Sequence, residues 1–175
     1  MEDFWRKIEM ADKKRFAMCC SIYSSQDEEV DSSGVKQAGL VDNHAYTLIG
    51  AKTIFLDQKG SDTERLIKIR NPYGRVEWQG AWGDKSSKWT VHTREQVNCE
   101  DKEDGIFFIS FKDFVKFFAT TTICFYFDDC EDSFITSQHE ENSWAMAKFT
   151  LERDNPQPLF VTLDQISERF FEPNL

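Results

Sequence analysis

Apolar residues recur at helical spacing near the start of the chain. Residues 3–15 predict an amphipathic helix, N-capped by Asp3, whose apolar side is formed by Phe4, Trp5, Ile8 and Ala11. The next apolar run, residues 17–22, is short enough for a strand. Residues 24–36 are polar and acidic and include turn-forming residues, so they predict a loop.

From residue 44 onward the pattern favours strands. Residues 44–56 are rich in β-branched and aromatic residues, and residues 65–70 alternate more cleanly, so both predict strands, joined by a hairpin connection at residues 58–62. Residues 73–90, rich in Gly and Trp, follow neither period and predict an ordered loop. The remaining predicted elements are strands at residues 105–110 and 121–127, and a short helix from a capping box at Ser110–Asp113 to Phe118.

The composition shifts near residue 128. Residues 128–132 and 137–142 are acidic and polar, which is typical of a linker. Two further strand candidates follow at residues 144–151 and 159–163, too few for a sheet that buries a face. The sequence therefore predicts an α+β domain with antiparallel strands over residues 1–127, followed by a linker and the beginning of a second domain over residues 128–175.

Composition narrows the class of protein. Hydrophobic residues make up 40% of the 175 positions, which is enough for a packed core. No apolar run approaches the roughly 18 residues of a membrane span, and the first residues do not resemble a secretory signal. The five cysteines are odd in number and show no CxxC spacing, as expected for reduced thiols. We therefore expect a cytoplasmic protein without a membrane span.

The charge balance bears on possible partners. A net charge of −10, from 31 acidic and 21 basic residues, excludes nucleic acid as an expected partner because such a surface repels phosphate backbones. Carboxylates that converge in space would instead suit a divalent cation. A charge surplus alone is typical of a solvated surface, so the cation hypothesis depends on which carboxylates meet.

Two segments carry residues suited to acid–base chemistry. His44 opens one predicted strand and Asn71 follows the next, so a hairpin can bring the two side chains face to face. The amide oxygen of an Asn can orient an imidazole without adding a charge, as in a Cys-His-Asn triad. Tyr73 could shield that hydrogen bond from water. Singly, a strand His or an Asn-Pro-Tyr-Gly turn is more often structural, so the combination carries the hypothesis.

The order of the motifs resembles one lobe of the two-lobed catalytic core of calpain-type, papain-like cysteine proteases. The resemblance covers residues 3–127 and rests on Cys20-Ser21-Ile22, Gly39-Leu40, His44-Ala45-Tyr46, Arg70 to Gly74, Glu77 to Asp84, Ser86 to Trp89, Glu103 to Gly105 and Ser110 to Phe114. As an ordered set these motifs are highly specific. The resemblance implies a twisted antiparallel sheet, or half-barrel, with flanking helices. Residues 128–175 resemble the beginning of the β-sandwich domain that follows this core in the family.

The resemblance implies a function and assigns roles to three residues. It implies calcium-dependent proteolysis of intracellular proteins, with protein substrates and a separate Cys-bearing lobe as partners. His44 would be the general base that forms a thiolate–imidazolium pair, and Asn71 would orient it. Tyr73 stands where the family usually has Trp and keeps an aromatic cover over the pair.

The chain departs from the family at the nucleophile. Papain-like enzymes place the catalytic Cys in a Gln-x-x-Cys-Trp type of context ahead of the His, and none of the five cysteines is followed by Trp or Tyr. We therefore expect the isolated chain to be inactive. A fragment, a truncated gene model and an inactive paralogue are all open interpretations. The alternative function is a non-catalytic, calpain-like interaction module, or pseudoprotease.

The resemblance also implies a Ca²⁺ site. Glu77, Asp84 and Asp104 match the family's ligand positions, and the backbone carbonyl of Lys102 could add another oxygen. Ile106 stands where a further acidic ligand is usual. We therefore expect a weakened site, or one in which a water replaces the missing carboxylate.

Overall fold

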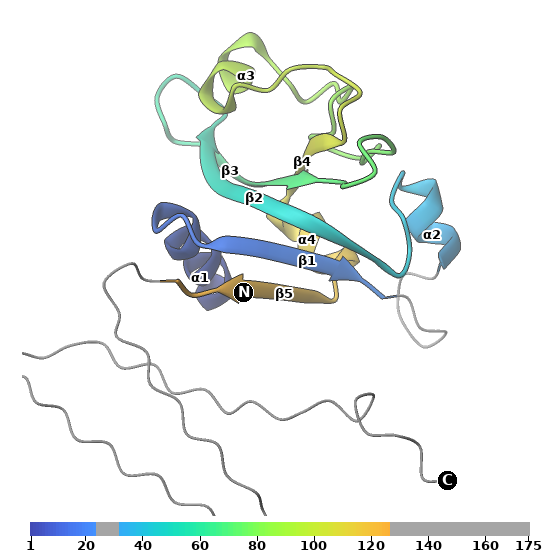
Figure 1. Cartoon of the computed structure of the whole chain (residues 1–175). Helices are drawn as coiled ribbons and strands as arrows, with labels where there is room; N and C mark the ends of the chain where they lie inside the picture. The colour runs from blue at the N-terminus through green and yellow to red at the C-terminus, as the bar shows by residue number, and fades with distance from the viewer. Residues whose placement is uncertain (24–31, 127–175) are drawn as a thin grey trace, which may run out of the picture. The chain divides into compact units, whose positions relative to one another are not determined.

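The structure, a computed structural model, describes residues 1–23 and 32–126 (Figure 1). The described residues belong to one unit, Met1–Cys130. Its elements in chain order are α1 (Glu2–Lys13), β1 (Ala17–Ile22), α2 (Ser32–Gln37), β2 (His44–Phe55), β3 (Thr63–Arg70), α3 (Val91–Val97), β4 (Ile106–Ser110), α4 (Phe111–Phe117) and β5 (Thr120–Cys124). The predicted linker and sandwich segment, residues 128–175, lies outside the described residues.

The five strands form one open, antiparallel sheet in the order β4-β3-β2-β1-β5. The long β2–β3 hairpin lies at its centre, and its register places Phe55 opposite Thr63 and Thr47 opposite Arg70. Antiparallel pairing therefore brings the start of β2 beside the end of β3, where the two candidate catalytic residues lie. The predicted α+β fold, an antiparallel sheet with flanking helices, is confirmed.

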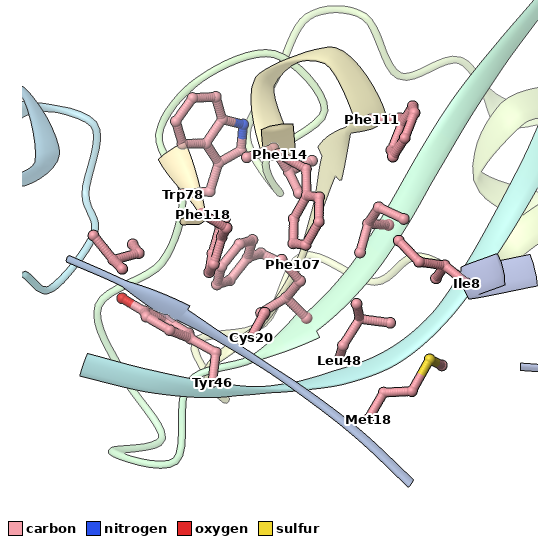
Figure 2. Packing of buried hydrophobic residues seen from close by; sticks show 14 of the residues in the cluster. Ile8, Met18, Cys20, Tyr46, Leu48, Trp78, Phe107, Phe111, Phe114 and Phe118 are labelled. Atoms are coloured by element: carbon pink, nitrogen blue, oxygen red, sulfur yellow. The ribbon is translucent and has the colours of Figure 1, made fainter. Parts of the chain in front are cut away.

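The larger hydrophobic cluster covers one face of the sheet (Figure 2). Helices α1 and α4 pack on this face, with the rings of Trp5 and Phe111 in edge contact at 5.1 Å. On the strands, the inward positions alternate with exposed ones, as the period of two requires. Buried side chains from the strands in this cluster include Met18, Cys20, Tyr46, Leu48, Ile67, Ile69 and Phe107.

A second, smaller cluster lies on the opposite face. It contains Leu66 and Phe108, whose sequence neighbours Ile67 and Phe107 belong to the first cluster. A β-bulge between Leu48 and Gly50 shifts the register, so that Ile54 joins the second cluster although Leu48, six residues earlier, joins the first. Trp82 of the Trp-rich loop belongs to this second cluster, and Trp89 of the same loop and Val97 of α3 pack against it.

Two short helices differ from the sequence expectation. Residues 32–37, predicted as part of a loop, form α2, which holds one buried side chain, Val35. Helix α3 was not predicted at all. The helix begins with a capping box formed by Thr90 and Thr93, whereas the usual capping box has Glu or Gln at the second position. It ends at Asn98, whose φ is 49°. Neither helix is long enough to show an apolar period.

Candidate active site

The candidate catalytic pair lies at one end of the β2–β3 hairpin. His44 is the first residue of β2, and Asn71 directly follows the last residue of β3. The Nε2 atom of His44 lies 3.1 Å from the Oδ1 atom of Asn71, within hydrogen-bonding distance. The structure therefore brings together the two residues that the sequence analysis paired across a hairpin.

The hydrogen bonds of Asn71 define which ring nitrogen of His44 carries a proton. The Nδ2 group of Asn71 donates to the carbonyl oxygens of Arg75 (2.8 Å) and Val76 (2.9 Å), and its Oδ1 accepts from the backbone N–H of Tyr73 (3.1 Å). Because Oδ1 can only accept, Nε2 of His44 must be the donor. The lone pair of Nδ1 is then available to act as a base. Asn71 itself is fully buried, which protects this arrangement from water.

Two tyrosines contact the imidazole of His44. The ring of Tyr73 stacks on it at a centroid distance of 4.3 Å, and the ring of Tyr46 meets it edge-on at 4.9 Å. Tyr73 is 64% exposed, so it lies on the solvent side of the imidazole. Tyr46 is buried and its hydroxyl accepts a hydrogen bond from the backbone N–H of Val41 (2.8 Å), which anchors the segment leading to His44.

Glu77 and Asp84 lie at a pocket of about 150 Å³ beside the Trp-rich loop. Both side chains are buried, and Asp101 and Glu103 also line the pocket. Burial raises the pKa of Asp84 to about 6, the backbone N–H of Lys102 opposes that rise, and the negative charges of Glu77, Asp101 and Asp104 add to it. A cation in the pocket would relieve this unfavourable concentration of charge.

The other predicted calcium ligands are placed differently. Asp104 is exposed and its Oδ1 accepts the backbone N–H of Ile106 (2.8 Å), and the carbonyl of Lys102 accepts the backbone N–H of Asp104 (3.0 Å). Neither Lys102 nor Asp104 lines the pocket. Within residues 1–23 and 32–126, no three His, Cys, Asp or Glu side chains converge as metal ligands. The described residues thus offer a cation two buried carboxylates. The six to eight oxygen ligands that Ca²⁺ prefers would be completed only if the 101–105 segment moved or if water molecules supplied the remaining oxygens.

Comparison with known proteins places these features in a family. The profile of the calpain family cysteine proteases matches residues 1–125. The chain belongs to the calpain family. Relatives include the mouse calpain-2 catalytic subunit, 36% identical over 124 residues, and the human calpain-1 catalytic subunit, 37% identical over 125. Rat calpain-13 is 37% identical over 121 residues. The matches cover 68–70% of this chain but only 17% of each relative.

The cysteines that the structure describes differ in burial and in the acidity of their thiols. Cys20 lies on the core face of β1, where burial raises its pKa strongly. Burial also raises the pKa of Cys99 to about 11, with the charges of Arg94 and Lys68 opposing the rise. Cys19 and Cys124 are exposed positions on β1 and β5. Cys130 lies outside the described residues.

The structure adds two residues to the calpain-like site that sequence reasoning did not assign. Tyr46 contacts the ring of His44. It belongs to the His44-Ala45-Tyr46 motif, and its two-residue spacing from His44 places both side chains on the same face of β2. Gly105 donates its N–H to Oε1 of Glu77 (2.7 Å), and its carbonyl accepts the backbone N–H of Asn71 (2.7 Å). Gly105 belongs to the Glu103–Gly105 motif, but that motif does not reveal its hydrogen-bond partners, because they come from distant parts of the chain.

Proposed function

We propose that this chain is the histidine/asparagine portion of the catalytic core of a calcium-dependent, calpain-type cysteine endopeptidase. Its substrates are intracellular proteins, it acts in the cytoplasm, and a Cys-bearing lobe completes the site. The supporting observation is the contact between Nε2 of His44 and Oδ1 of a fully buried Asn71 whose amide orientation is fixed by two backbone carbonyls. Without the Cys-bearing lobe the chain is inactive.

The geometry suggests how the pair works once a thiol is supplied. Nδ1 of His44 takes the proton of the thiol, which leaves a thiolate beside an imidazolium. The thiolate attacks the carbonyl carbon of the peptide, and the imidazolium then donates its proton to the departing amine nitrogen. Asn71 holds the ring through Nε2–H in both protonation states, because a neutral amide oxygen accepts from either. Tyr73 limits the access of water to that bond.

We test this proposal by supplying a calpain-type Cys lobe in trans and measuring hydrolysis of an unstructured protein substrate. We expect activity with the wild-type chain and none with His44→Ala. His92→Ala is the matched control, because His92 is exposed on α3 and packs elsewhere. Absence of activity, with the two lobes shown to associate by sedimentation, would instead favour the alternative of a non-catalytic interaction module.

Calcium dependence is a separate part of the proposal. Glu77 and Asp84 would supply charged oxygens, and a bound Ca²⁺ would offset the repulsion among the pocket's carboxylates. We expect millimolar Ca²⁺ to raise the melting temperature of the wild-type chain, and Asp84→Asn to abolish that rise. Glu95→Gln, an exposed carboxylate on α3, serves as the charge-matched control. If Ca²⁺ leaves the melting temperature of the wild-type chain unchanged, the proposed calcium dependence is contradicted.

A further inference from the structure

One residue, Gly105, connects the acidic pocket to the His44–Asn71 pair through its backbone N–H and its backbone carbonyl. On one side its N–H donates to Oε1 of Glu77 at 2.7 Å. On the other side its carbonyl accepts the backbone N–H of Asn71 at 2.7 Å. Asn71 in turn contacts His44 through Oδ1 at 3.1 Å. A series of hydrogen bonds, joined by the covalent bonds within Gly105 and Asn71, therefore links the Glu77 carboxylate to the imidazole.

Gly105 fits closely against the turn that carries Asn71. Its φ is +83°, a conformation that favours glycine. A Cβ atom at this position would lie 2.7 Å from the carbonyl oxygen of Asn71 and 2.9 Å from the Cα of Gly74. A displacement of the Gly105 peptide would thus push directly on the 71–74 turn. The hydrogen-bond series is supported by packing and does not depend on the bonds alone.

The segment that contains Glu77 also holds the side chain of Asn71. The carbonyls of Arg75 and Val76, the two residues before Glu77, accept both bonds from its Nδ2 group. Glu77 is 8% exposed, so its bond to Gly105 is a charge-assisted bond shielded from solvent. Both the backbone and the side chain of Asn71 are consequently tied to residues 75–77.

We propose that Glu77 is a positioning residue for the catalytic pair, acting through the backbone of Gly105 to fix Asn71 and thereby the ring of His44. This inference deepens the proposed function and rests on it for the role of His44. The hydrogen-bond series itself joins residues of this chain alone. It gives Glu77 a role beyond that of an acid at the pocket.

The test compares Glu77→Ala, Glu77→Gln and Glu103→Gln by NMR, on the full chain with a metal chelator present. Glu103 lines the same pocket and is exposed, so its substitution changes the pocket's charge without touching Gly105. In Glu77→Ala we expect hydrogen exchange of the Asn71 backbone amide to accelerate by about tenfold or more, since its partner is no longer held. The Hε1 signal of His44 should move as the stacking on Tyr73 loosens, while that of His92 stays in place.

The conservative variant distinguishes positioning from a general structural effect. The amide oxygen of Gln can still accept the Gly105 N–H, so Glu77→Gln should restore slow exchange at Asn71 and the wild-type His44 signal. The proposal would be overturned if Glu77→Ala and Glu103→Gln showed the same hydrogen-exchange rate at the Asn71 amide and the same Hε1 signal of His44. If Glu77→Ala does not fold, Glu77→Asp replaces it in the test, because Asp keeps the negative charge but its shorter side chain does not reach the N–H of Gly105. Hydrogen exchange of the Asn71 amide at the wild-type rate in Glu77→Asp would then overturn the proposal. The readouts need no second lobe, so a failure here is distinct from absent proteolysis in trans.

Discussion

The fully buried side chain of Asn71 makes four hydrogen bonds, and together they assign the proton of the neutral His44 ring to Nε2. The residue types and their spacing were enough to predict the pair, because a hairpin places the start of one strand beside the end of the next. The orientation of the amide could not be predicted. It depends on the carbonyls of Arg75 and Val76 in a loop without periodicity.

Removing the Asn71 side chain should destabilise the chain as well as release His44. Asn71→Ala leaves the buried carbonyls of Arg75 and Val76 without their donor, and we expect the free energy of unfolding to fall by about 1–3 kcal/mol. Urea unfolding followed by tryptophan fluorescence measures this loss. A change of less than about 0.5 kcal/mol, typical of an exposed site, would show that these bonds are not made.

The described cysteines should differ sharply in reactivity. Burial raises the pKa of Cys20 and Cys99, so both remain neutral thiols at pH 8. Iodoacetamide at that pH should alkylate the exposed Cys19 and Cys124 in the folded chain, and Cys20 and Cys99 only after unfolding. Peptide mass spectrometry reads out each site. Rapid alkylation of Cys20 in the folded chain would mean that β1 does not bury it.

At the scale of elements, strong periodicity was a good guide and loops were not. The predicted strand at residues 17–22 matches β1, and α1 and β2 agree with expectation to within a residue or two at their ends. Helix α2 was missed because a single buried side chain, Val35, is its apolar signal. The acidic pocket could be predicted only in part. Glu77 and Asp84, which the resemblance names as calcium ligands, both line it. Asp101 and Glu103 line it as well, and they come from an irregular loop.

The contact between α1 and β3 should make stability depend on pH. Two hydrogen bonds from Arg65 to Glu2, of 2.8 and 3.1 Å, hold the pKa of Glu2 below its usual value of 4.5. A lowered pKa in the folded state means that the unfolded chain binds the proton more readily. The contribution of Glu2 is therefore present above pH 4.5 and is lost as the pH falls below it.

Unfolding free energies measured across this acidic range test the contact. Glu2→Gln should flatten the part of the pH dependence that lies below 4.5. Glu9→Gln, which removes the partner of Lys13 within α1, is the matched control and should leave that slope unchanged. Identical slopes in the two variants would indicate that the Glu2–Arg65 contact does not form in solution.

At the scale of the whole molecule, the matched region corresponds to a small share of each relative's length. The described unit has a complete antiparallel sheet with clusters on both faces, and it presents His44 and Asn71 at the end of the central hairpin. It matches the calpain family over residues 1–125, and that match makes up 17% of each relative's length. Under the proposed function, the orientation of His44 by Asn71 is the arrangement that a Cys-bearing lobe would complete.

The alkylation rate of a Cys-lobe thiol at pH 6, measured with and without this chain, tests that central claim most directly. A free thiol with a pKa near 8.5 is almost entirely protonated at pH 6, whereas pairing with His44 would create a thiolate. We predict that the wild-type chain accelerates alkylation by about tenfold or more and that the His44→Ala chain does not. Equal rates with both chains, under conditions where both bind the lobe, would contradict the assignment of His44 as the catalytic base.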